Sequence, residues 1–121
     1  MARALIPVTQ LVRNSGTVVA SAGTAETSDG NYIPAGAVTG DFVLHVNNTG
    51  DAGTVTFKAG ANPPSLTAGE GDLALDIDGT AEAYYMIETA RFTQEDGTIN
   101  IDFDDVTASV AAYEVRQAGV S

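Results

Sequence analysis

The sequence predicts an all-β protein, and two observations support this class. First, apolar side chains recur at every second position in short runs between Asp41 and Val115, which is the period of a half-buried strand. Second, glycine, asparagine and aspartate separate these runs, and no run keeps the helical period of about 3.6 residues. The regular spacing of the turns indicates a sandwich or a barrel.

Alternation predicts which side chains of each strand face the core. Four runs give the inward-facing sets Phe42, Leu44 and Val46; Val55 and Phe57; Leu73, Leu75 and Ile77; and Ile99, Ile101 and Phe103. The residues between them are Thr, Asn, Asp, His, Lys or Ala in most positions, and we expect these to face water. Function is therefore expected on the water-facing set.

Turn residues set the limits of the strands. We expect loops at Asn47–Gly53 and at Asn62-Pro63-Pro64, and a turn at Asp78-Gly79. Glu95-Asp96-Gly97 predicts a hairpin between strands 90–94 and 98–104, and the last strand is expected at 109–116. Residues 81–92 are interpreted as a strand with a bend or bulge, because Tyr, Ile, Thr and Phe favour strand there although the alanines allow a helical turn.

Length and composition predict one domain. A chain of 121 residues with 44% hydrophobic residues can bury one core, and 13 glycines with only 17% charged residues fit a turn-rich β protein. Residues 1–40 differ from the rest, because small residues dominate between 21 and 40. We expect residues 1–40 to form an N-terminal arm and a long loop, and residues 41–121 to form the core of the sandwich.

The charge balance disfavours two classes of partner. With 16 acidic and 5 basic residues the net charge is −11, which repels nucleic acid and anionic membranes. The basic residues are scattered, no run of about 18 apolar residues occurs, and cysteine is absent. Pro7 and Gln10 interrupt the apolar start before it reaches the length of a signal peptide, so we expect cytoplasmic synthesis.

The reactive residues do not predict an enzyme. His45 is the one histidine, and its alternation places it opposite the core with no nucleophile motif nearby. Aspartate pairs leave a glycosidase-type acid and base as an alternative, and they leave calcium as the one metal to consider if their strands are neighbours. These residues are Asp76, Asp78, Asp102, Asp104 and Asp105. We expect no cofactor, and solvated carboxylates on a strand face.

Two features of residues 1–40 are candidates for binding a partner. The first segment carries the apolar residues Leu5, Ile6, Val8, Leu11 and Val12, as expected for a strand that adds to a neighbouring sheet. The alternative is an ordinary first strand of the domain's own sheet, with Pro7 at an edge. Tyr32 is the second candidate, chosen from the tyrosines at 32, 84, 85 and 113 because it stands in the long loop.

The order of these elements resembles small virion proteins of tailed bacteriophages. The likeness lies in Arg3–Pro7, Asp29–Pro34, Phe42–Gly50, Thr54–Lys58, Gln94–Phe103 and Ala111–Arg116. The resemblance implies an antiparallel, jelly-roll-like β-sandwich on the capsid exterior that decorates the head and cements the major capsid protein. It also implies a homo-oligomer, with trimers typical of such proteins. A tail or neck component and a carbohydrate-binding module remain alternatives.

Overall fold

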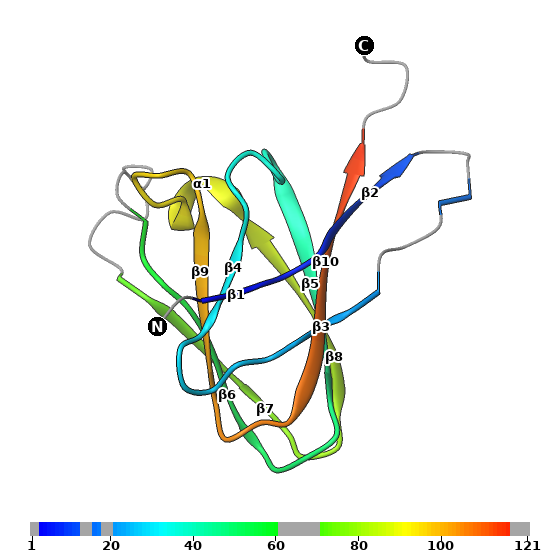
Figure 1. Cartoon of the computed structure of the whole chain (residues 1–121), viewed down its shortest axis with the longest axis vertical. Helices are drawn as coiled ribbons and strands as arrows, with labels where there is room; N and C mark the ends of the chain where they lie inside the picture. The colour runs from blue at the N-terminus through cyan, green and yellow to red at the C-terminus, as the bar shows by residue number, and fades with distance from the viewer. Residues whose placement is uncertain (1–2, 13–15, 18–20, 61–70, 117–121) are drawn as a thin grey trace.

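Two five-stranded sheets pack face to face in the computed structural model (Figure 1). Sheet A contains, in spatial order, β1 (Ala4–Leu5), β4 (Asn31–Ile33), β9 (Ile99–Asp104), β6 (Gly53–Phe57) and β7 (Leu73–Ile77). Sheet B contains β2 (Val8–Val12), β10 (Ala108–Arg116), β5 (Asp41–Asn48) and β8 (Glu82–Glu88), and β3 (Gly23–Thr24) pairs with β10. The structure describes residues 3–12, 16–17, 21–60 and 71–116.

This architecture confirms the predicted β-sandwich, with two departures from purely antiparallel pairing. β1 lies parallel to β4, and β2 lies parallel to β10, so both sheets are mixed. Successive strands from β4 to β10 alternate between the sheets except at the β6–β7 hairpin, which resembles the alternation of a jelly roll.

The first segment forms edge strands of its own domain. Residues 4–5 extend sheet A, the chain then crosses to sheet B, and residues 8–12 extend that sheet. Pro7 stands at the crossing, where its missing N–H removes no ladder bond, while its carbonyl accepts from Ala112 N at 2.9 Å. Ile6 is fully buried at the same point. Of the two alternatives for this segment, an arm that adds to a neighbouring sheet or a first strand of the domain's own sheet, the structure therefore shows the second.

The core contains the side chains that alternation predicted. All of the inward-facing sets are buried except Leu73 and Leu75, which are partly buried and pack against the core from β7. Residues from outside these sets complete the core: Ile6, Ile33, Val38, Ile87, Phe92, Val106, Ala108, Val110 and Ala112. Because both sheets contribute to this one layer, the chain folds around a single core.

Three predicted elements differ in the structure. Within 81–92, β8 is a strand up to Glu88, but Thr89–Phe92 form one helical turn, α1, instead of continuing with a bend. The helical turn places Phe92 in the core, with its ring centroid 5.8 Å from that of Phe57. As a result the strand predicted at 90–94 is wrong, and only the bridge between Thr93 and Ile99 flanks the turn at 95–97.

The predicted long loop at 21–40 contains two short strands. β4 lies inside sheet A between β1 and β9, and β3 pairs with β10. Asn31 joins them: its buried side chain donates to Thr24 O at 2.9 Å and accepts from Glu26 N at 2.8 Å. Alternation over three residues is too short to be seen in the sequence. The loop predicted at Asn62-Pro63-Pro64 lies outside the described residues.

Asn48 ties three connections together at one end of the sandwich. It is 1% exposed at the end of β5, and all four of its amide hydrogen bonds are made. Its Nδ2 donates to the carbonyls of Asp51 and Asp78, at 2.7 and 3.0 Å. Its Oδ1 accepts from the N–H groups of Gly50 and Thr107, at 3.1 and 3.3 Å. One side chain thus holds the β5–β6, β7–β8 and β9–β10 connections.

We expect Asn48→Ala to lower the free energy of unfolding by about 1 to 3 kcal/mol, because it removes a buried amide and leaves four part-buried main-chain groups without this partner. The matched control is Asn47→Ala, which changes the exposed neighbour on the outer face and is expected to cost less than about 0.5 kcal/mol. Urea denaturation followed by circular dichroism measures both. Equal losses for the two variants would contradict the role given to Asn48.

Candidate functional site

The outer faces of the two sheets differ in chemistry. On sheet A most outward side chains are polar, with Leu5 and Tyr32 at the β1–β4 edge as the large exceptions, and Arg3 and Lys58 there are paired with carboxylates. Arg3 Nη1 lies 2.6 Å from Asp102 Oδ1, and Lys58 Nζ lies 2.7 Å from Asp72 Oδ2 and 3.9 Å from Asp102 Oδ2. The hydrogen bond to Asp72 is the largest cause that raises the pKa of Lys58, so this lysine stays charged. This face is an ordinary solvated surface.

On sheet B the outward side chains form an apolar surface, which we call the sheet B face. It is defined by Leu11 of β2; Ala111, Tyr113 and Val115 of β10; Val43 and His45 of β5; and Tyr84 and Met86 of β8. The strand register puts Tyr113, Val43 and Met86 in one row across the sheet. Ala111, His45 and Tyr84 form the next row. Three strands therefore contribute to each row of this surface.

The exposed part of the sheet B face is concentrated on β8. Met86 is 75% exposed and Tyr84 is 68% exposed, compared with 56% for Val115. Scattered single apolar residues are normal on a protein surface, but adjacent exposed apolar side chains on one sheet face are typical of interaction sites. The surface thus provides the clearest candidate for binding among the described residues.

Acidic residues border the sheet B face. Glu82 and Glu88 stand at the two ends of β8, and Asp41 stands opposite Glu88 on β5. Glu82 Oε2 lies 2.6 Å from His45 Nε2, and the His45 ring stacks on Tyr84 with centroids 4.6 Å apart and an interplanar angle of 23°. The one histidine of the chain therefore positions Tyr84 and Glu82 on this surface.

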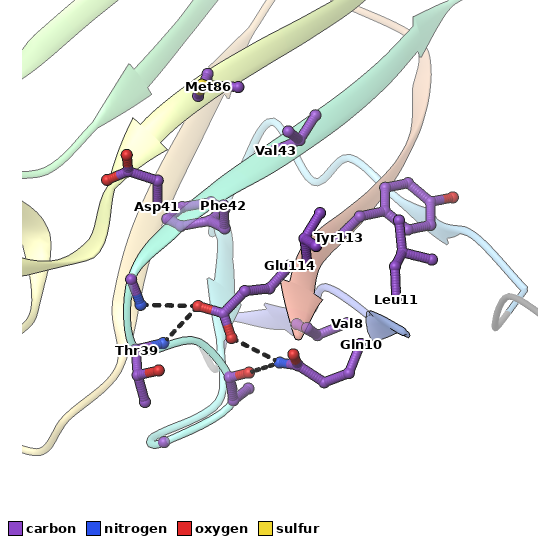
Figure 2. Close-up of a pocket in the computed structure, with 14 residues that line it drawn as sticks. Val8, Gln10, Leu11, Thr39, Asp41, Phe42, Val43, Met86, Tyr113 and Glu114 are labelled. Carbon is purple, nitrogen blue, oxygen red and sulfur yellow. Dashed lines mark hydrogen bonds between the residues drawn. The ribbon is translucent and has the colours of Figure 1, made fainter. Parts of the chain in front are cut away.

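A groove of about 990 Å³ opens at one end of the sheet B face. Its lining includes Val43, Met86 and Tyr113 from the face and the loop at residues 36–41 (Figure 2). Two side chains fix this loop. Glu114 accepts from the N–H groups of Thr39 and Gly40 at 2.8 and 2.7 Å, and Gln10 Nε2 donates to Glu114 Oε1 at 2.8 Å and to Ala37 O at 2.7 Å. β2, β10 and the loop therefore meet at one carboxylate.

The environment of Glu114 lowers its pKa. Burial alone raises the pKa of this carboxyl, but the hydrogen bonds from Gly40, Thr39 and Gln10 together outweigh burial, and the pKa lies below its ordinary value of 4.5. A carboxyl whose pKa is lower in the folded state stabilises the fold above the pKa that it has in the unfolded chain. That stabilisation is lost as the pH falls through the folded-state pKa.

We expect Glu114→Gln to reduce the dependence of stability on pH. Between about pH 6 and pH 3 the free energy of unfolding of the unaltered protein falls, and part of this fall belongs to protonation of Glu114. The variant keeps a side-chain oxygen that can accept a hydrogen bond but has no proton to gain, so its stability falls less over the same interval. Parallel urea titrations across this pH range measure the difference, and identical slopes would contradict it.

The structure separates the residues predicted to bind a partner. Ile6 is in the core and is not available to a partner, which corrects its assignment as an anchor of a free arm. Val8 packs against the core, and Val12 follows the same inward alternation. Leu11 belongs to the sheet B face. Leu5, 50% exposed, lies beside Tyr32 on the outer face of sheet A.

The sequence alone does not single out Tyr84 or Met86. Tyr84 is one of four tyrosines, and its exposure depends on the register between β5 and β8, which the sequence does not reveal. One signal was present, because apolar residues at 84 and 86 alternate with inward residues at 85 and 87 and are flanked by Glu82 and Glu88. Two apolar sets in one strand indicate a strand with apolar side chains on both faces.

Strand order determines which of the candidate calcium-binding aspartates are neighbours. β7 and β9 are not neighbours, because both pair with β6, and Thr54 lies between Asp76 and Asp104 in the register. The condition that the strands carrying these aspartates are neighbours is therefore not met. Asp102 also forms an ion pair with Arg3. Among the described residues no group of three or more His, Cys, Asp or Glu side chains is placed to hold a metal ion. Asp76, Asp78, Asp104 and Asp105 are exposed.

Comparison of the chain with models of known protein families, with curated proteins and with solved structures finds no match. In the described part of the chain no helix is long and apolar enough to cross a membrane.

Proposed function

We propose that this protein is a structural component of a bacteriophage particle that binds the outer surface of the capsid. In this role it stabilises contacts between major capsid subunits, as a head decoration or cement protein does. The observation that carries the proposal is the sheet B face, an exposed apolar surface on a rigid sheet with acidic residues at its border. The order of sequence elements that resembles such virion proteins supports the same role.

The physical demands of this role fit the described surface. A protein on the outside of a shell must adhere to protein and must not compete for packaged DNA, and a net charge of −11 repels phosphate. Apolar side chains at the centre of a contact supply most of its free energy, while charges at the rim select the partner. Many copies, each with a modest contact, together hold subunits against outward pressure.

Imaging of labelled particles tests the location. Antibody against this protein, applied to particles of the phage that encodes it, is expected to label the head at many positions. Label at the tail or neck alone would replace head decoration with a tail or neck role. Absence of label from the particles, together with selective binding of a glycan, would replace the virion role with carbohydrate binding.

We expect the double substitution Tyr84→Ser and Met86→Ser to weaken binding to undecorated particles by at least about tenfold, because it removes the apolar centre of the sheet B face. The comparison variant is Tyr32→Ser, which changes the tyrosine that the sequence selected as a binding candidate; because Tyr32 lies on the outer face of sheet A, this variant is expected to bind normally if the sheet B face is the contact. Co-sedimentation with particles over a series of protein concentrations measures the affinities. Normal binding of the double variant and weak binding of Tyr32→Ser would move the contact to the other sheet.

A further inference from the structure

We propose that the free edge of β8 binds an extended segment of the capsid partner as an added β-strand, and that this segment has basic side chains flanking an apolar centre. The inference rests on the proposed function, since it names the part of the partner that would be recognised.

The main chain of β8 is open on one side. Among the described strands β8 pairs with β5 alone and ends sheet B, and its seven residues make it the longest edge strand of the sandwich. Asn48 N donates to Ala81 O, which sets the phase of the antiparallel ladder. In such a ladder alternate residues bond to the neighbour, so the main-chain groups of Glu82, Tyr84, Met86 and Glu88 point toward the free edge.

The same four residues present their side chains on the sheet B face. These four residues would therefore bond to the main chain of an added strand and would also contact its side chains on the sheet B face, as in strand addition to other sheets. β8 has none of the usual protections of an edge strand, because it contains no proline and is neither short nor bulged over its ladder with β5. Acidic residues at its ends are the exception.

Charge disfavours a second copy of this chain as the added strand in the register that overlaps the two β8 strands fully. If two β8 strands pair antiparallel about a two-fold axis through Tyr85, Glu82 of each copy lies opposite Glu88 of the other. Like charges directly opposite one another destabilise a strand pair. Each copy also carries a net charge of −11, which adds repulsion over the whole approach. The terminal glutamates therefore disfavour this self-pairing and favour a strand with basic residues at its ends.

The pattern of β8 specifies the complementary segment. Its outward sequence is acidic, aromatic, apolar and acidic at alternate positions, so the partner needs a basic residue, two apolar residues and a basic residue at the same spacing. This pattern reads the same in both directions, and it therefore fits an antiparallel or a parallel strand. Glu82 is accessible for the contact, because its side chain is 55% exposed although it also bonds to His45.

A synthetic peptide tests the edge without the particle. Titration of the isotope-labelled full chain with the peptide KTVTVTK is expected to shift the amide signals of Glu82, Tyr84, Met86 and Glu88 in nuclear magnetic resonance spectra. The charge-reversed peptide ETVTVTE is expected to bind at least about tenfold more weakly, because it loses two ion pairs and gains repulsion. Addition of salt is expected to reduce this difference.

Two variants separate main-chain binding from charge. Met86→Pro removes an N–H that points to the free edge and that β5 does not use, so it is expected to abolish peptide binding while the protein stays folded. The double substitution Glu82→Gln and Glu88→Gln keeps the main chain and is expected to remove the preference for KTVTVTK over ETVTVTE. If Met86→Pro does not fold, the double substitution still tests whether the glutamates at the ends of β8 select the basic peptide.

Several results would overturn strand addition. These are equal binding of the two peptides, shifts confined to other strands, and self-association through β8 detected by sedimentation. Normal binding of folded Met86→Pro to undecorated particles would also overturn it, while the proposed capsid role would stand. Peptide binding with the expected preference in a protein that does not bind particles would support the edge site and reject the capsid role.

Discussion

A single layer of apolar side chains shared by two sheets is the constraint on which this structure depends. Each strand has only two faces, and the inner face must be filled by residues such as Phe42, Leu44 and Ile101 because no other core exists among the described residues. Once the inner faces are assigned, the outer faces are fixed as well, since neighbouring side chains along a strand alternate. The difference between the outer faces of sheets A and B therefore carries the functional information.

Polar side chains close the two ends of this layer. At one end the amide of Asn48 satisfies main-chain groups from three connections, and at the other end Glu114 and Gln10 fix the loop at residues 36–41 against β2 and β10. The Asn48 amide makes all four of its hydrogen bonds and the Glu114 carboxylate accepts three, and such pairing lets polar groups lie at the border of a core without large cost. The rigid sheets that result can present a surface whose side chains stay in register.

Local patterns in the sequence predicted the longer strands after residue 40 and most of their inward residues, because alternation is a property of each strand alone, but they missed β3 and β4 and wrongly placed a strand at 90–94. They did not predict which strands are neighbours, because pairing joins residues far apart in the chain. This explains why Asp76 and Asp104 were candidates for one metal site although Thr54 separates them. The parallel pairing of β1 with β4 and of β2 with β10 could not be predicted for the same reason.

The positions of the helical turn and of the exposed apolar surface also depend on contacts between strands far apart in the chain, so the sequence did not predict them. Phe92 enters the core only because α1 turns the chain inward after β8, and strand propensity at 81–92 could not show this. Tyr84 and Met86 were visible as an apolar pair between Glu82 and Glu88, but only the position of β8 at the edge of sheet B makes them exposed. A pattern with apolar side chains on both faces of a strand is the signal to look for.

Hydroxyl-radical footprinting of particle-bound protein against free protein measures the central claim most directly. The claim is that the sheet B face is the adhesive surface, so attachment is expected to protect Tyr84 and Met86 from oxidation while Tyr32, on the outer face of sheet A, reacts as in the free protein. Unchanged oxidation of Met86 in bound protein, with protection of Tyr32, would contradict the account.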